Sequence, residues 1–142
     1  MKKRVVITGE GSISPLGHNS QSLWENLVKG KSGIDHISSF DTENFSIKIA
    51  GEVKDFDPNN FFEAKEARKL DRFTMFGLIA AEQALQNSNY KSSDAGVIVG
   101  TGVGGMHTLE EEHQKLIKKG QRGVSPFYVP KMIPNIAGGQ IA

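Results

Sequence analysis

The sequence contains no cysteine among its 142 residues. This absence excludes a disulfide framework, a thiolate metal site and a cysteine nucleophile within the chain. It does not identify a redox compartment, because a cytosolic protein needs no cysteine either. Thiolate chemistry is therefore excluded for these residues by themselves.

The sequence also has little net charge and no long apolar run. Its 17 basic and 16 acidic residues leave a charge of +1, so the whole chain has no long-range field that would gather nucleic acid or a membrane surface. The basic start is followed by only residues 5–7 as an apolar run, too short for a signal peptide, and no stretch reaches membrane-spanning length. We therefore expect a cytoplasmic protein that binds neither nucleic acid nor a membrane.

Glycine, by contrast, is abundant. The chain has 16 glycines in 142 residues, about 11%, whereas the average usage is about 7%. Apolar residues make up 37% of the chain. This composition is that of a globular protein, and the length fits one domain with its own core. The extra glycines point to specialised loops.

Three apolar segments have the patterns of strands. Residues 5–8 and 95–99 are unbroken runs rich in β-branched side chains, which is typical of strands buried on both faces of a sheet. In residues 45–53 the apolar side chains recur at every second position, which predicts a half-buried strand. The succession of strand, glycine loop and helix after residue 95 indicates an α/β fold.

Apolar residues at intervals of three and four predict helices at about 20–29, 65–87 and 106–119. Asn19 or Ser20 can cap the first of these, and Gly30 ends it. A further apolar helix begins after Asn135, and no stop signal follows it. We therefore expect the chain to be cut short at this helix.

The glycine loop of residues 100–105 fits the Gly-x-Gly-x-x-Gly pattern of dinucleotide-binding proteins. That pattern also requires an acidic residue at the end of a second strand about 20 residues later, which this sequence does not provide. The carboxylates of residues 110–112 would oppose a pyrophosphate as well. We favour glycines that let the backbone pass close to another segment, and keep a small α/β nucleotide-binding enzyme as an alternative.

The sequence predicts no metal site, no cofactor and no catalytic constellation. Glu110 and His113 have the spacing of a di-iron helix pair, but the second pair and the further carboxylates that such a site needs are missing. No Gly-x-Ser-x-Gly elbow is present to carry a hydrolase nucleophile. A solvated helix face explains Glu110 and His113 better.

One charge pattern points to a partner. Four basic residues are spaced so that they would form a single stripe on a helix, opposite its apolar face. These residues, which we call the basic stripe, are Lys65, Arg68, Lys69 and Arg72. The stripe is either an ordinary solvated face or a docking surface for an acidic protein. A non-catalytic module that docks such a protein is a second alternative.

Nine segments in register resemble the start of β-ketoacyl-acyl carrier protein synthases, and the elongating type II enzymes of bacterial fatty acid synthesis are the most similar. They are RVVITG (4–9), SPLG (14–17), GKSGI (30–34), FD (40–41), AGEV (50–53), KEARK (65–69), GTGVGG (100–105), SPFYVP (125–130) and PN (134–135). The resemblance implies a thiolase-like layered α/β fold, of which the chain supplies the first part of the N-terminal half. Residues 1–142 would then be one ketosynthase domain that is incomplete at its C-terminal end.

The resemblance also implies an activity. Members of this family are homodimers that elongate an acyl chain by decarboxylative condensation with malonyl-acyl carrier protein, and they use no cofactor. Their cysteine nucleophile and two histidines have no counterpart in this chain. We therefore expect the chain alone to be inactive, and to expose apolar surface where later strands of the family fold would pack.

The family's binding residues can be carried over where this sequence matches. The resemblance implies that Lys65, Arg68, Lys69 and Arg122 contact acyl carrier protein, that Val103 and Met106 line the acyl pocket, and that Tyr128, Val129 and Ile133 line the partner subunit's pocket at the dimer interface. Three positions depart from the usual pattern. Gly123 replaces a basic residue, Val103 replaces a larger branched residue, and Tyr128 replaces a phenylalanine.

Overall fold

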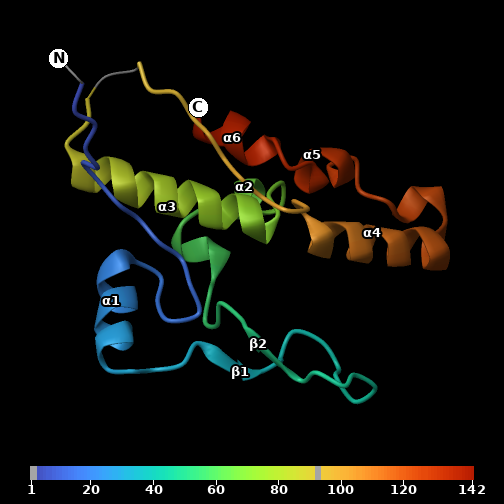
Figure 1. The fold of residues 1–142 in the computed structure, drawn as a ribbon. Coiled ribbons are helices and arrows are strands. Elements are labelled where there is room, and N and C mark those ends of the chain that lie inside the picture. Colours follow the sequence, from blue (N-terminus) through green and yellow to red (C-terminus); the bar gives the residue numbers. More distant parts are fainter. Residues whose placement is uncertain (1–2, 92–93) are drawn as a thin grey trace. The chain divides into compact units, whose positions relative to one another are not determined.

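A computed structural model of the chain describes residues 3–91 and 94–142 (Figure 1). The chain divides into two compact units. The first contains the residues up to Phe56 together with Ile79–Tyr90, and the second contains Asp57–Leu78 and Lys91–Ala142. Helix α3 (Arg72–Ser88) contributes residues to both. All the binding residues expected from the sequence belong to the second unit.

Helix α1 (Ser20–Val28) has the start and the stop that the sequence predicts. The Asn19 side chain accepts a hydrogen bond of 2.8 Å from the Ser22 backbone nitrogen, and the Ser22 hydroxyl oxygen accepts one from the Asn19 nitrogen. This reciprocal pair satisfies backbone donors that the first turn of a helix leaves free. Gly30 follows with a φ of 67°, which glycine adopts without strain.

The sheet of the first unit is a short antiparallel pair. β1 (Ile34–His36) pairs with β2 (Ile49–Gly51), so that Ile34 lies opposite Gly51. The prediction of a half-buried strand over residues 45–53 is therefore wrong in length and in burial, since only residues 49–51 form the strand and the Ile49 side chain is exposed. The reason is that β1 offers only 3 residues for pairing, so most of the segment extends past the end of its partner.

Residues 5–8 and 95–99 are both described by the structure, and neither forms the buried strand that the sequence predicts. Most of their apolar side chains are exposed instead: Val5 is 95% exposed and Ile98 is 99% exposed, while Val97 is half-buried. A β-branched run favours extended backbone, but a strand also needs a neighbour to hydrogen-bond its backbone and a layer to cover its side chains. Neither segment has such a neighbour within residues 3–91 and 94–142, so both predictions are wrong for this chain by itself.

The second unit is helical. In chain order its elements are η1 (Pro58–Asn60), α2 (Ala64–Ala67), the start of α3, α4 (Met106–Lys119), η2 (Gln121–Gly123), α5 (Tyr128–Met132) and α6 (Ile136–Ile141). α4 has the predicted bounds, and α6 is the helix expected after Asn135. α6 packs against α3 beside Gly77, where an added Cβ would lie 4.0 Å from the Ala137 Cβ. The buried side chains of this unit include Met75 and Ala137 and the polar residues Asp71, Thr74, Thr108 and Glu112.

The helix predicted over residues 65–87 is broken in two. α2 ends at Ala67, and the chain makes a tight turn before α3 begins at Arg72. Asp71 causes the break because its carboxylate oxygen Oδ1 accepts a hydrogen bond of 3.2 Å from the Phe73 nitrogen and so caps α3. The basic stripe consequently does not lie on one continuous helix, and the geometry expected for it is wrong.

Candidate functional site

The basic stripe surrounds the turn between α2 and α3, and its four side chains are exposed. Lys65 belongs to α2, Arg68 and Lys69 follow it, and Arg72 begins α3. Two of these cations lie over aromatic rings. The Lys69 Nζ lies 5.9 Å from the centre of the Phe127 ring, and the Arg72 guanidinium lies 5.0 Å from the centre of the Phe76 ring. Such contacts orient a cation while leaving it accessible to an anionic partner.

An apolar hollow of about 460 Å³ adjoins Lys69. Its lining residues are Phe62, Glu66, Lys69, Leu70, Leu78, Phe127, Pro130, Ile136 and Gln140. Most of this lining is apolar, while Lys69 and Glu66 supply one charge of each sign. The hollow could therefore receive an apolar side chain from a partner whose charged groups meet the neighbouring basic residues.

The segment that carries Phe127 is fixed to α4 by a buried carboxylate. Glu112 accepts a hydrogen bond of 2.6 Å from the Ser125 nitrogen and one of 2.7 Å from the Lys115 Nζ. The hydrogen bond from Lys115, and then the one from Ser125, lower the pKa of Glu112, while the same bond to Glu112 raises the pKa of Lys115. The carboxylate therefore stays ionised and holds this segment in place.

This role of Glu112 was not expected from the sequence, in which residues 110–112 look only like charges at the start of a helix. A signal was nevertheless present. Thr108, Glu112 and Lys115 are separated by four and three residues, so they share one face of α4. Thr108 and Glu112 are both buried, which makes this a polar face turned toward the protein.

Arg122 lies on η2 and is not among the residues that line the hollow. Gly120 precedes it with a φ of 67°, and the Gly123 nitrogen donates a hydrogen bond of 2.9 Å to the Gly120 carbonyl oxygen. A Cβ at Gly123 would lie 2.7 Å from the Lys119 Cβ, so a larger residue at this position would require Lys119 to shift. Arg122 is an exposed charge on a different element from those that carry the basic stripe.

The glycine loop ends in a close approach between backbones. The Gly105 nitrogen donates a hydrogen bond of 2.9 Å to the Met132 carbonyl oxygen at the end of α5. A Cβ at Gly105 would lie 2.6 Å from the Lys131 carbonyl oxygen, closer than real Cβ atoms come. The interpretation that these glycines allow close packing is confirmed at Gly105, whereas a Cβ at Gly102 would meet no described atom within 4 Å.

The start of α4 is already occupied by an anion of the chain itself. The Asp71 Oδ2 accepts a hydrogen bond of 3.2 Å from the Thr108 nitrogen and one of 2.5 Å from the Thr108 hydroxyl. A pyrophosphate bound to the glycine loop would need donors at the helix start that are free, whereas these donate to Asp71. The geometry therefore argues against the dinucleotide alternative.

The two residues expected in the acyl pocket lie on the surface of the second unit. Val103 and Met106 are each more than half exposed. Met106 lines a shallow hollow of about 440 Å³ together with Leu109, Glu110 and His113, all on one face of α4. The described residues do not enclose Val103 and Met106 in a pocket.

The three residues expected at a dimer interface come from α5 and its end. Tyr128 and Val129 lie on α5, and Ile133 follows it. Val129 is exposed, while Tyr128 and Ile133 are half-buried. α5 also contacts the glycine loop, because the Gly105 nitrogen donates a hydrogen bond to the Met132 carbonyl oxygen. These three residues and the end of the glycine loop therefore belong to one packed region.

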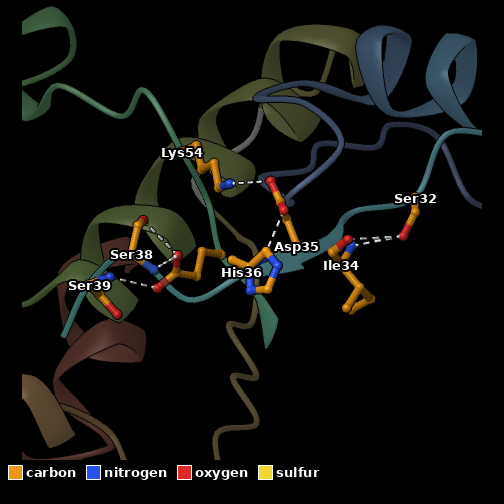
Figure 2. Close-up of polar contacts among 8 residues, drawn as sticks. Ser32, Ile34, Asp35, His36, Ser38, Ser39 and Lys54 are labelled. Atoms are coloured by element: carbon orange, nitrogen blue, oxygen red, sulfur yellow. Dashed lines mark hydrogen bonds and ion pairs between the residues drawn. The ribbon is translucent and has the colours of Figure 1, made fainter. Parts of the chain in front are cut away.

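A polar cluster in the first unit was not expected from the sequence. In Figure 2 Lys54 reaches Asp35, and their ion pair measures 2.6 Å. Glu52 accepts hydrogen bonds of 2.8 Å from the Ser38 nitrogen and 3.1 Å from the Ser39 nitrogen. Hydrogen bonds from the Ser39 side chain and from Ser38 lower the pKa of Glu52 to about 2. These contacts stabilise the β1–β2 pair and the chain that leaves it.

Within residues 3–91 and 94–142, no three histidine, aspartate or glutamate side chains come together as metal ligands. The pair Glu110 and His113 instead borders the shallow hollow with Met106. No helix in the same residues is long and apolar enough to span a membrane.

Comparison with known sequences gives a consistent assignment. Residues 2–142 match the family model "Beta-ketoacyl synthase, N-terminal domain". The chain is 46% identical over 145 aligned residues to 3-oxoacyl-[acyl-carrier-protein] synthase 2 of Staphylococcus aureus (strain N315), and 44% identical over 146 to the protein of the same name in Vibrio cholerae. Each alignment covers 99% of this chain and 35% of the relative. The chain therefore spans about a third of the length of these curated relatives.

Solved structures agree on the fold. The ishigamide ketosynthase/chain length factor matches with a TM-score of 0.82 at 26% identity, covering 96% of this chain and 36% of that one. The AntDE:AntF complex, a type II PKS acyl-carrier protein with its ketosynthase, matches with a TM-score of 0.76 at 26% identity over 99% of this chain and 38% of the other. A β-ketoacyl synthase from Burkholderia phymatum has the same fold, with a TM-score of 0.76 at 21% identity over 99% of this chain and 36% of its own.

The expected fold class is thereby confirmed: the chain has a thiolase-like α/β fold, of which it supplies the N-terminal portion. The resemblance read from the nine sequence segments is confirmed as well. The match over residues 2–142 and the identity to the two curated relatives show that the chain belongs to the β-ketoacyl synthase family, in its N-terminal domain.

Proposed function

We propose that the chain is the N-terminal part of a condensing enzyme that elongates acyl chains in fatty acid biosynthesis. In the proposed reaction an acyl thioester on the enzyme condenses with malonyl-acyl carrier protein. Carbon dioxide leaves the malonyl group, a carbon–carbon bond forms to the acyl carbonyl, and the enzyme's thiol is released. The observation that carries this proposal is the family match over residues 2–142, together with relatives that bear the synthase name.

The chain by itself is inactive in this proposal. It has no cysteine to attack the acyl thioester, so the nucleophile lies outside these residues. The family resemblance implies that the two histidines of the reaction lie outside them as well. Residues 1–142 are then one ketosynthase domain, incomplete at its C-terminal end, in a cytoplasmic enzyme that needs no cofactor. Formation of a β-ketoacyl product by the purified 142-residue chain would overturn this assignment.

We assign docking of acyl carrier protein to Lys65, Arg68 and Lys69, with Arg122 as a further contact. The support is their exposure, the position of Lys69 over the Phe127 ring and the apolar hollow beside it. Acyl carrier protein is an acidic helical bundle in this family, so exposed cations that flank an apolar hollow complement its surface. Arg122 departs from the family pattern in one respect, because the residue that follows it is Gly123 and not a second basic residue.

We assign Val103 and Met106 to the wall of the acyl pocket, and Tyr128, Val129 and Ile133 to the interface of a homodimer. Apolar side chains as exposed as Val103, Met106 and Val129 are stabilised when another surface covers them. A second subunit would supply that surface. The smaller side chain of Val103 leaves more room for the acyl tail than the larger branched residue usual there.

Binding of a purified bacterial holo-acyl carrier protein to the 142-residue chain tests the docking part of the proposal. Fluorescence anisotropy at low ionic strength should give saturable binding that weakens as salt is added. Binding that is absent at low salt, or that does not change with salt, contradicts the assignment.

A non-catalytic module that docks an acidic protein would use the same basic stripe. The intact mass of the protein in its native cell separates the two candidates. A mass near 15.5 kDa favours the module, and a mass about three times larger, as the 35% coverage of the relatives suggests, favours the synthase.

A further inference from the structure

One carboxylate caps two helices of the second unit. The Asp71 Oδ1 accepts a hydrogen bond of 3.2 Å from the Phe73 nitrogen in the first turn of α3. Its other oxygen, Oδ2, accepts from the Thr108 nitrogen at 3.2 Å and from the Thr108 hydroxyl at 2.5 Å, in the first turn of α4. Asp71 is 5% exposed and Thr108 is 2% exposed, so water does not compete for these bonds.

Each end of this junction adjoins a different part of the proposed site. On the side of α3, the turn that carries Arg68 and Lys69 is closed by hydrogen bonds of 2.8 Å from the Lys69 nitrogen to the Glu66 oxygen and 3.2 Å from the Leu70 nitrogen to the Ala67 oxygen. This turn, which we call the docking turn, ends at Asp71. The order of the docking turn therefore determines where the Asp71 backbone lies.

On the side of α4, Thr108 follows Met106 and the glycine loop. Gly105 packs directly on the junction, since a Cβ there would lie 3.0 Å from the Asp71 Oδ2. The Gly105 nitrogen also bonds the Met132 oxygen at the end of α5. The Asp71 carboxylate therefore contacts the first turn of α4 and the last glycine of the loop that carries Val103. Through Gly105 it is also linked to the end of α5.

We propose that Asp71 is a positioning residue that couples the docking turn to the first turn of α4. A carrier protein bound to Lys65, Arg68 and Lys69 orders the turn that ends at Asp71. Because the Asp71 carboxylate bonds Thr108, ordering this turn lowers the cost of ordering the segment of residues 104–109. Binding of the carrier protein to the basic residues thus steadies Met106, which lies outside the docking turn. The inference rests on the proposed docking function.

Hydrogen exchange of the 142-residue chain, with and without saturating bacterial holo-acyl carrier protein, tests the coupling. In the wild type, exchange of residues 104–109 is expected to slow by about fivefold or more on binding, while exchange in α1 stays unchanged. The affinity is measured in the same solution by anisotropy. Saturable binding without any slowing at 104–109 overturns the coupling but leaves the docking function standing, whereas absence of binding overturns both.

Two variants of Thr108 separate coupling from simple stability. Thr108→Ser keeps the hydroxyl that donates to Asp71 and should keep the slowing. Thr108→Val removes the hydroxyl and leaves only the backbone bond, so it should reduce the slowing, with the affinity for carrier protein changed by less than about twofold. Equal slowing in both variants overturns the role of Asp71. If circular dichroism shows that Thr108→Val does not fold, Asp71→Asn replaces it, since the amide can accept from only one of the two helix starts.

Discussion

The Glu112 carboxylate lies 2.6 Å from the backbone nitrogen of Ser125, and this bond joins α4 to the segment that leads into α5. The carboxylate is buried and also accepts from the Lys115 Nζ. Phe127 follows two residues after Ser125, and Lys69 lies over its ring. The position of one cation of the basic stripe therefore depends on an acidic residue of a different helix.

Replacing Glu112 by glutamine should destabilise the chain in a pH-dependent way. At neutral pH we expect a loss of about 1–3 kcal/mol, since a charged acceptor is removed from buried donors. The folded protein lowers the pKa of Glu112 below its ordinary value of 4.5, so its contribution is fully present above that value and is lost as the pH falls through the folded pKa. Urea denaturation of both proteins over a series of pH values measures this, and the difference should shrink in acid.

Glu111→Gln is the matched control. Glu111 is about half exposed and pairs with His107 at 3.2 Å and with Lys115 at 3.9 Å on the surface of α4. Exposed pairs contribute little, so this variant should change the free energy of unfolding by less than about 0.5 kcal/mol. A loss equal to that of Glu112→Gln would mean that charge on α4, and not the bond to Ser125, is the cause.

The same substitution should have opposite effects at two buried threonines. Thr74 is fully buried, and its hydroxyl has no hydrogen-bond partner among the described residues, so Thr74→Val is expected to stabilise the chain by about 1 kcal/mol. The Thr108 hydroxyl donates to Asp71, so Thr108→Val should destabilise by about 1–3 kcal/mol. Urea denaturation of both variants provides the measurement. Destabilisation by Thr74→Val would show that its hydroxyl is bonded after all.

Features that local chemistry decides were predictable from the sequence. The start of α1 at Asn19 and its stop at Gly30 were expected, as was the extent of α4, because caps and apolar spacing act within a few residues. The break before α3 was not expected. Leu70 and Phe73 continue the helical spacing, and Asp71 interrupts it through a capping bond and a contact with Thr108, 37 residues away.

The expected strands at residues 5–8 and 95–99 failed for another reason. Their side chains favour extended backbone, but a strand forms only against a partner, which a segment's own residues cannot supply. The candidate site shows the same limit. The family resemblance pointed to Lys69, whereas its contact with Phe127 and the role of Glu112 depend on segments that meet only in the folded chain.

A methyl group added to the glycine loop should act differently at two positions. A Cβ at Gly105 would lie 2.6 Å from the Lys131 oxygen and 2.9 Å from the Met132 Cα, so Gly105→Ala is expected to cost about 1–3 kcal/mol. A Cβ at Gly102 would meet no described atom within 4 Å, so Gly102→Ala should change stability by less than about 1 kcal/mol. Thermal and urea denaturation measure both. Equal effects would contradict the close approach of Gly105 to α5.

Charge reversal in the basic stripe should weaken binding of acyl carrier protein. For Lys65→Glu combined with Lys69→Glu, we expect the dissociation constant to rise on the order of tenfold at low salt, because two attractive charges become repulsive. The difference from the wild type should shrink as salt is added, since the screening length falls from about 10 Å at 0.1 M to about 3 Å at 1 M. Anisotropy titrations at several ionic strengths measure this.

Lys31→Glu combined with Lys48→Glu is the control for net charge. These two lysines are exposed and belong to the first unit, so the double variant makes the same change in total charge without altering the basic stripe or the surroundings of Arg122. Its dissociation constant should stay within about twofold of the wild type, since long-range charge steers association but does not determine where the partner docks. If both double variants weaken binding equally, the carrier protein responds to overall charge, and the assignment of Lys65 and Lys69 as contacts is wrong.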